Sequence, residues 1–260
     1  MTISPSPSLR MGRRRGGYNP RPMGLGLRRL RFLFERAFSE PKPTDYKMTW
    51  NGIAVQDAHE GILTGATDES FERLGRQDAE LVAKYLRGGD AVLNIGCGVG
   101  RVEKYLAPRV REMWSIDISG EMIRLAGKRL AGLPNVHLRE VGNREFLSSF
   151  RTGTMDVVFS FLVLQHMERE DAFLYLRDAH RVLKPGGRLF TQFPNLLSPV
   201  YTRAHLENVE AFPRSDGRVR AYTEAEVRHV LALAGFEITE LWPGGHEDLP
   251  AELYVAAVRR

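Results

Sequence analysis

Three closely spaced glycines follow a short apolar run near residue 95. The segment Val92–Arg101 reads VLNIGCGVGR, so Gly96, Gly98 and Gly100 come directly after a strand-like pattern. Glycine lets the backbone turn at positive φ and approach a ligand closely. Such a loop on its own is also an ordinary strand-to-helix turn. It becomes informative only together with a second residue that would bind the same ligand.

That second residue is an acid at the end of the next strand pattern. Asp117 closes the sequence WSID, 21 residues after Gly96. At this position a carboxylate can accept both hydroxyls of a ribose, so loop and acid together predict a ligand of the adenosine type. The spacing is G-x-G-x-G with Arg101 in the sixth position, whereas dinucleotide sites use G-x-G-x-x-G. The pattern therefore disfavours NAD.

A histidine follows the apolar segment MDVVFSFLVL and is the candidate catalytic base. Neutral imidazole near pH 7 can take a proton from a hydroxyl, and His166 would stand at the end of a strand beside the ligand. Its neighbour Gln165 would orient the substrate. The alternatives are structural, with His166 capping the next helix or hydrogen-bonding a loop, and Gln165 satisfying backbone groups. Cys97 is expected to be a small loop residue, because a thiol behind a ligand cannot reach a second substrate.

These side chains require a sheet to position them. From residue 74 onward, helix and strand patterns alternate with short breaks, which is typical of βα units around a parallel sheet. The expected strands are 91–95, 112–117, 136–140, 155–161 and 187–193, and the expected helices are 75–87, 100–107, 120–131 and 171–183. Thr223 and Glu226 predict a capping box, and Gly235 ends that helix. FEITELW and ELYVAAV then predict a hairpin whose last strand is antiparallel to the sheet.

Residues 195–221 are longer than an ordinary connection. They are rich in turn-forming residues, so we expect a loop-rich insertion that acts as a small lid over a substrate. Three ring-bearing residues in this region are candidate substrate contacts, with lid packing as the alternative: Tyr201, His205 and Tyr222. Tyr46 and Trp50, before the first expected helix, would either close over the ligand or anchor the residues that precede them.

Composition narrows the class of protein. With 260 residues and 43% hydrophobic content, the chain can bury one substantial core. Its single cysteine excludes an intrachain disulfide, and no histidine pair has the i,i+4 spacing of a metal site, so no metal is expected. No apolar run approaches roughly 18 residues, so no spanning helix is expected. A reducing, cytoplasmic location is the expectation that follows.

The positive charge is concentrated at one end of the chain. Residues 1–40 hold nine Arg and two Glu, a charge of +7, which leaves −2 for the remainder of a chain with +5 in total. An acidic body has no electrostatic footprint for a phosphate backbone, so no nucleic-acid partner is expected. Residues 1–45 are expected to be a disordered basic leader with an amphipathic helical pattern. Residues 10–38 would contact an anionic membrane or a protein, unless that helix packs on the domain.

Four segments, VLNIGCGVGR, WSIDIS, MDVVFSFLVLQHM and LKPGGRLF, resemble in order and spacing the motifs of class I S-adenosylmethionine-dependent methyltransferases. The resemblance covers about residues 70–258. It implies an α/β doubly wound, mostly parallel seven-stranded sheet with an antiparallel last strand, in a methyltransferase domain over 46–260. It also implies S-adenosylmethionine as the cofactor and methyl transfer to a small-molecule acceptor, for which a hydroxyl is the expected group. It does not indicate an oligomeric state.

The resemblance further implies which residues bind the cofactor. They are Gly96, Cys97 and Gly98 against the methionine, Asp117 on the ribose, Ile118 and Met122 against the adenine, Asn143 with Arg144 near the adenine amino group, and Phe161 and Leu162 from the fourth strand. The chain departs from the family at Asn94 and Asn143, where acids are usual. A neutral hydrogen bond there is weaker than a charge-assisted one by about 1 kcal/mol.

Those two amides leave alternatives open. The first is an inactive methyltransferase-like binding protein, and a less favoured one is a nicotinamide-dependent reductase. A methylase acting on nucleic-acid bases is disfavoured, because the segment FLVLQH lacks the Asn/Asp-Pro-Pro-aromatic element of those enzymes.

Overall fold

The computed structural model describes residues 45–63, 65–142, 148–211, 217–246 and 249–260. All of them belong to the unit Thr44–Arg260. The predicted leader, except for Asp45, and the predicted cofactor residues Asn143 and Arg144 lie outside the described residues. Within the described ranges, no helix is long and apolar enough to cross a membrane. Among the described residues, no group of three or more His, Cys, Asp or Glu side chains could hold a metal ion.

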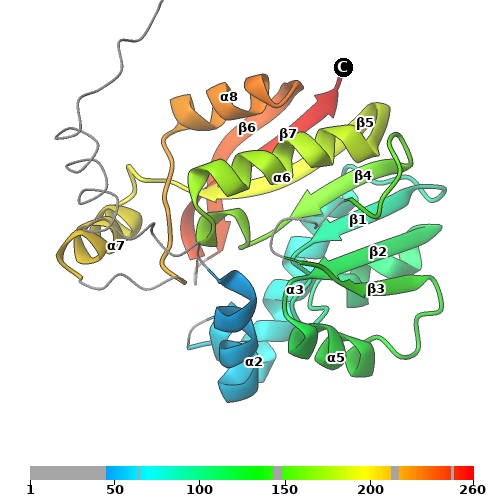
Figure 1. Cartoon of the computed structure of the whole chain (residues 1–260), viewed down its shortest axis with the longest axis horizontal. Helices are drawn as coiled ribbons and strands as arrows, with labels where there is room; N and C mark the ends of the chain where they lie inside the picture. The colour runs from blue at the N-terminus through cyan, green and yellow to red at the C-terminus, as the bar shows by residue number, and fades with distance from the viewer. Residues whose placement is uncertain (1–44, 64, 143–147, 212–216, 247–248) are drawn as a thin grey trace, which may run out of the picture. The chain divides into compact units, whose positions relative to one another are not determined.

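The described residues form a seven-stranded sheet in the order β3-β2-β1-β4-β5-β7-β6 (Figure 1). Its strands are β1 (Ala91–Ile95), β2 (Glu112–Asp117), β3 (Val136–Glu140), β4 (Met155–Ser160), β5 (Leu183–Pro194), β6 (Phe236–His246) and β7 (Leu249–Arg259). β7 pairs antiparallel with both β5 and β6, and the other pairs are parallel. The predicted fold class, including the antiparallel last strand, is confirmed.

The described residues form seven α-helices, some of which pack on the two faces of the sheet. They are α2 (Tyr46–Ile62), α3 (Asp68–Ala83), α4 (Glu103–Leu106), α5 (Gly120–Arg129), α6 (Arg169–Val182), α7 (Pro199–Glu210) and α8 (Glu224–Leu233), with short 3-10 turns η1 (Ala107–Arg109) and η2 (Leu164–His166). Alternation along β1 separates the two cores. Leu93 and Ile95 pack with α6 and α8, which lie on one face in Figure 1, whereas Val92 packs with α3 and α4 on the other.

Several predicted boundaries were wrong for local reasons. The helix expected over 100–107 is reduced to α4 and then tightens into η1, because Pro108 has no N–H with which to continue the α-helical ladder. The helix expected over 75–87 begins at Asp68, where the Thr67 side chain accepts from the Ser70 N–H. The strand expected over 187–193 is longer, because β5 begins at Leu183.

Two helices were not predicted at all. α2 was missed because its apolar residues do not gather in one stripe, and its backbone is kinked at Asp57. α7 lies inside the predicted loop-rich insertion. Pro199, interpreted as a loop signal, occupies its first turn, where proline is favoured, and Ser198 caps it by accepting from the Tyr201 N–H. The insertion is therefore part helix.

The two ends of the insertion are joined at the end of β5. The Tyr222 N–H donates to the Pro194 carbonyl at 2.8 Å, and the Leu196 N–H donates to the Tyr222 carbonyl at 2.8 Å. The Arg220 N–H donates to the Gln165 carbonyl at 2.7 Å. Residues 217–222, which we call the strap, thus run beside η2 and fix the insertion to the sheet.

The predicted capping box at the start of α8 is present, and its contribution to stability can be tested. The Glu226 N–H donates to Thr223 Oγ1 at 3.3 Å, and the Thr223 N–H donates to Glu226 Oε2 at 2.7 Å. Thr223→Ala removes one of these bonds and should lower the free energy of unfolding by about 1 kcal/mol. In thermal denaturation this corresponds to a Tm about 2–4 °C lower.

Arg228→Ala, on the exposed side of the same helix, is the matched control. It removes only a surface ion pair with Glu224 and should change stability by less than about 0.5 kcal/mol. Equal effects of the two substitutions would contradict the assigned cap.

Candidate functional site

A cavity of about 980 Å³, including its open mouth, lies at the carboxyl ends of β1, β2 and β4. Its walls are the glycine loop, the start of α5, the segment between β4 and α6, and one side of α2. Open α/β sheets bind ligands at this edge. The fold therefore places a cavity where the sequence motifs converge.

The glycine loop is held against β2 by its own backbone. The N–H groups of Gly96 and Cys97 both donate to the Ile116 carbonyl, at 2.8 and 2.9 Å. Gly96 has φ +77°, and a Cβ added there would lie 2.2 Å from Val163 Cγ2. Only glycine fits this position, because a side chain would both strain the backbone and collide with the opposite wall.

Asp117 connects the loop to the next strand. Its Oδ2 accepts from the Gly98 N–H at 2.8 Å and its Oδ1 from the Ser119 N–H at 2.9 Å. Burial raises the pKa of this carboxyl, while the backbone donors partly oppose that rise. A carboxylate has about four acceptor positions. Asp117 therefore fixes the loop and keeps acceptor capacity for a ligand in the cavity that it lines.

Asn94 replaces the acid that the motif usually carries, and a carboxylate stands beside it in space. Asn94 Nδ2 donates to Glu103 Oε1 at 2.5 Å, and both side chains are buried. Burial raises the pKa of Glu103. Because the amide nitrogen points to Glu103, the other amide atom, Oδ1, is a buried acceptor with no hydrogen-bond partner among the residues that the structure describes. Sequence reasoning missed Glu103, which read as an ordinary residue of a short helix.

Arg101 holds α3 against the loop. Its Nη2 pairs with Asp78 at 2.6 Å, with both side chains at most 5% exposed, and its guanidinium lies over the Phe71 ring. Gly75 allows the close approach, since a Cβ there would lie 2.6 Å from Arg101 Cγ. A broken buried pair of this kind leaves an uncompensated charge, so Arg101 is a structural anchor in the cavity wall.

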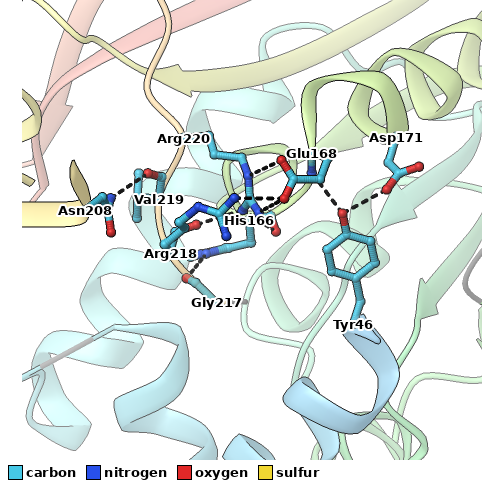
Figure 2. Close-up of polar contacts among 9 residues, drawn as sticks. All are labelled: Tyr46, His166, Glu168, Asp171, Asn208, Gly217, Arg218, Val219 and Arg220. Carbon is cyan, nitrogen blue, oxygen red and sulfur yellow. Dashed lines mark hydrogen bonds and ion pairs between the residues drawn. The ribbon is translucent and has the colours of Figure 1, made fainter. Parts of the chain in front are cut away.

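His166 also lines the cavity, and Figure 2 shows its contact with Gly217 of the strap. Its Nδ1 lies 2.8 Å from the Gly217 carbonyl, which can only accept, so Nδ1 carries the proton and Nε2 carries the lone pair. The Trp50 ring of α2 stands at an edge-to-face angle 5.0 Å away. Burial lowers the pKa of His166 to about 4, and the nearby Arg220 contributes. The imidazole is therefore neutral near pH 7.

Glu168 joins three separate segments around His166 (Figure 2). Its carboxylate accepts from Arg220 at 2.5 Å and from Arg218 at 2.9 Å, and these two cations hold the pKa of Glu168 below its usual range. Its backbone N–H donates at 2.9 Å to the hydroxyl of Tyr46, which in turn donates at 2.8 Å to Asp171. The strap, η2 and α2 are thereby fastened around one carboxylate and its backbone.

Most of the predicted site residues that the structure describes surround the cavity. Its lining includes Gly96, Cys97, Gly98, Asp117, Ile118, Met122, Phe161, Leu162 and His166, together with Tyr46 and Trp50. Burial raises the pKa of the Cys97 thiol, which therefore stays neutral, as expected of a loop residue. Gln165 is buried, with its Nε2 3.1 Å from His166 Nε2, and is not among the lining residues.

The ring-bearing residues of the insertion region lie elsewhere. Tyr201 and Tyr222 are buried outside the cavity lining, and His205 is exposed, so lid packing describes the two tyrosines better than substrate contact. The lining also contains residues that sequence reasoning did not select, including Ile62, Val141, Met167 and Tyr175. Apolar or aromatic residues of this kind carry no motif, and only their place in the fold identifies them.

Comparisons with known proteins agree on one class. Residues 93–191 match the family model described as a methyltransferase domain. An uncharacterized 37.1 kDa protein in transposon TN4556 of Streptomyces fradiae is 34% identical over 164 residues, which are 60% of this chain and 46% of that protein. Ubiquinone biosynthesis O-methyltransferase of Xanthomonas oryzae pv. oryzae is 35% identical over 105 residues, 39% of this chain and 42% of that enzyme.

The fold has a solved counterpart. Magnesium protoporphyrin IX methyltransferase from Synechocystis PCC 6803, with bound SAH, superimposes with a TM-score of 0.64 at 21% identity, covering 82% of this chain and 98% of that one. The alignments to the two sequence relatives span less than half of their length. The resemblance to class I S-adenosylmethionine-dependent methyltransferases, predicted from four motifs, is confirmed.

The neutral state of His166 predicts how stability depends on pH. Above about pH 6.5 the imidazole is neutral in both states and contributes nothing. As the pH falls from 6.5 to about 4, His166 binds a proton in the unfolded chain but stays mostly neutral in the folded chain. The free energy of unfolding therefore decreases. The loss assigned to His166 is about 2–3 kcal/mol, and urea denaturation at successive pH values measures it.

His166→Asn is the comparison variant, because an asparagine amide can still donate to the Gly217 carbonyl but does not titrate. Subtracting its pH curve removes the contributions of Asp117 and Glu103, whose raised pKa values act in the opposite direction. Parallel curves for the two proteins between pH 6.5 and 4 would show that His166 is not held neutral.

Proposed function

We propose that this chain, whose residues 93–191 carry a methyltransferase domain of the S-adenosylmethionine-dependent class, transfers a methyl group to a hydroxyl of a small-molecule acceptor. One observation carries the proposal. A single cavity has a glycine loop with Asp117 on one side and a neutral histidine with an available lone pair on the other. The first side suits the cofactor, and the second suits an acceptor that must lose a proton.

The residues present fit S-adenosylmethionine. The partnerless Oδ1 of Asn94 is a buried acceptor in the cavity wall, suited to an ammonium group. Asp117 offers its remaining lone pairs to ribose hydroxyls, and Ile118 and Met122 give an apolar wall for a base. When bound, the cofactor supplies an electrophilic methyl group on a sulfonium centre.

His166 receives the proton that the acceptor loses. Its Nε2 lone pair is now satisfied by Gln165 Nε2 at 3.1 Å, and an acceptor hydroxyl would replace that amide as the donor. The Nδ1–H bond to Gly217 keeps the ring oriented as Nε2 takes the proton. The low pKa keeps the lone pair available at neutral pH, although it makes the imidazole a weak base. Much of the rate must therefore come from positioning.

The acceptor side of the cavity favours a flat, largely apolar molecule. Tyr46, Trp50, Met167 and Tyr175 supply aromatic and thioether surface beside His166. The O-methyltransferase of ubiquinone biosynthesis among the relatives supports a hydroxyl as the group that is methylated. A phenolic or enolic hydroxyl suits this wall best, because its proton is acidic enough for a weak base.

Calorimetric titration with S-adenosylhomocysteine tests the cofactor site. We expect micromolar binding that falls at least about tenfold in Asp117→Ala, since a hydrogen bond to a charged group contributes about 1.5–3 kcal/mol. NADH should not bind. Binding of NADH instead would favour the reductase alternative.

Turnover tests the acceptor side. With a panel of phenolic and enolic acceptors, His166→Asn should lower kcat by about 10²-fold or more while leaving affinity for S-adenosylhomocysteine within about twofold. Cofactor binding without methylation of any acceptor in the panel would favour the non-catalytic alternative. Unchanged turnover in the variant would remove His166 from the reaction.

A further inference from the structure

We propose that Gln192, a buried residue of β5 outside the cavity lining, is a positioning residue that fixes the direction of a hydrogen-bond chain and thereby makes Nε2 of His166 the proton-accepting atom. The catalytic meaning of this inference rests on the proposed function of His166. The direction of the chain is a property of the protein alone and can be measured without any ligand.

The hydrogen-bond chain begins at a backbone N–H, which can only donate. The Leu162 N–H donates to Gln192 Oε1 at 2.9 Å. Because a backbone N–H never accepts, this bond determines which end of the Gln192 amide faces Leu162. The Gln192 Nε2 must then face the other way, where it donates to Gln165 Oε1 at 3.2 Å and to Glu252 Oε2 at 3.1 Å.

The same polarity continues to the histidine. Since Gln165 Oε1 accepts from Gln192, the donor end of the Gln165 amide is left to face His166, and its Nε2 lies 3.1 Å from His166 Nε2. That imidazole nitrogen must accept. At the far end, His166 Nδ1 must donate, because it faces the Gly217 carbonyl at 2.8 Å. Two independent backbone groups, one at each end, therefore require the same neutral tautomer.

The surroundings oppose a reversal of the chain. Gln192, Gln165 and Glu252 are 2%, 6% and 1% exposed, so water cannot readily replace a lost partner. The Glu252 carboxylate also accepts from the Tyr201 hydroxyl of α7. Turning the Gln192 amide would set its oxygen against this carboxylate and its NH₂ against the Leu162 N–H. It would exchange favourable bonds for two repulsive contacts in a buried site.

The first link also shapes the cavity wall. Leu162 has φ +58°, in the left-handed region that non-glycine residues seldom adopt. The Gln192 side chain binds the N–H of this strained residue, whose side chain lines the cavity. Strain of this kind persists only where the surroundings hold it. Gln192 therefore holds a wall residue and, through Gln165, the histidine on the same side of the site.

The fixed direction has a consequence for proton transfer. A proton on His166 Nε2 would face the Gln165 N–H. Without a bound acceptor, the hydrogen-bond chain therefore disfavours the imidazolium form of His166. Two cationic side chains near the ring, those of Arg220 and Arg218, are both paired with Glu168. The histidine can take a proton only after the acceptor hydroxyl has displaced the amide, which couples proton transfer to acceptor binding.

The test uses the ligand-free full chain and nitrogen NMR of the histidine rings, with the His166 signals identified by their loss in His166→Asn. The parent protein should show a neutral ring protonated on Nδ1 throughout pH 5–8. In Gln192→Met the Gln165 amide is free to turn and can offer Oε1 to a protonated Nε2. The pKa of His166 should then rise by about one unit or more, while the Gly217 carbonyl still keeps the neutral ring protonated on Nδ1.

Thr191→Val is the matched control on the same strand. Thr191 is 1% exposed and its Oγ1 donates to the Ser160 carbonyl at 3.2 Å, so the substitution removes a buried hydrogen bond one residue away. It should lower stability without moving the His166 signals. A His166 pKa in Gln192→Met equal to that of the parent would overturn the proposal, whatever the change in stability.

A second variant covers the case in which Gln192→Met does not fold. Gln165→Glu replaces the donor opposite Nε2 by an acceptor, so His166 should be protonated at neutral pH. If the His166 ring in this variant stays neutral and protonated on Nδ1, the hydrogen-bond chain does not control its protonation and the proposal is wrong. Titration of the parent with S-adenosylhomocysteine reports separately on the proposed function, so failure of either idea can be recognised.

Discussion

The contact between Asp117 and the glycine loop is the constraint on which the cavity depends. The loop needs positive φ at Gly96, Gly98 and Gly100, and such a backbone is stable only if its N–H groups are satisfied. Ile116 and Asp117, adjacent residues at the end of β2, supply the acceptors. Because β1 and β2 are parallel neighbours, the loop after one and the acid after the other must meet at the same sheet edge. The half of the cavity that we propose binds the cofactor thus follows from sheet topology.

Local signals in the sequence were sufficient for this half. The strands were predicted because apolar runs end at glycines or acids, and α8 because Thr223 and Glu226 satisfy each other within one turn. α2 escaped prediction because tertiary packing, and not an amphipathic stripe, stabilises it, and α7 because proline at a helix start looks like a loop. Glu103 escaped for a related reason, since nothing in its neighbours shows that its side chain turns inward to Asn94.

The other half of the cavity, which we propose binds the acceptor, has a different origin. Its wall brings together α2, η2 and the strap, and Tyr46 of α2 also donates to Asp171 of α6, which lies 125 residues later. Glu168 and its two arginines hold them together through charge-assisted bonds, whose geometry no local pattern encodes. α2 contacts both halves, because its Asn51 Oδ1 accepts from the Ser119 hydroxyl at 2.8 Å, two residues beyond Asp117. Of these segments, the strap is therefore the better place for substitutions meant to spare the glycine loop.

The buried polar groups between these halves are costly, and this bears on what they do. Apolar residues of similar volume in place of the Arg101–Asp78 pair or the Gln192–Glu252 contact would avoid desolvation, often with no loss of stability. What apolar residues cannot supply is direction. A hydrogen-bond chain with a backbone donor at one end and a backbone acceptor at the other has one stable polarity, and this polarity determines which ring nitrogen of His166 accepts. The geometry of the site therefore depends on groups that never touch its ligands, because they determine which atoms of the cavity wall donate and which accept.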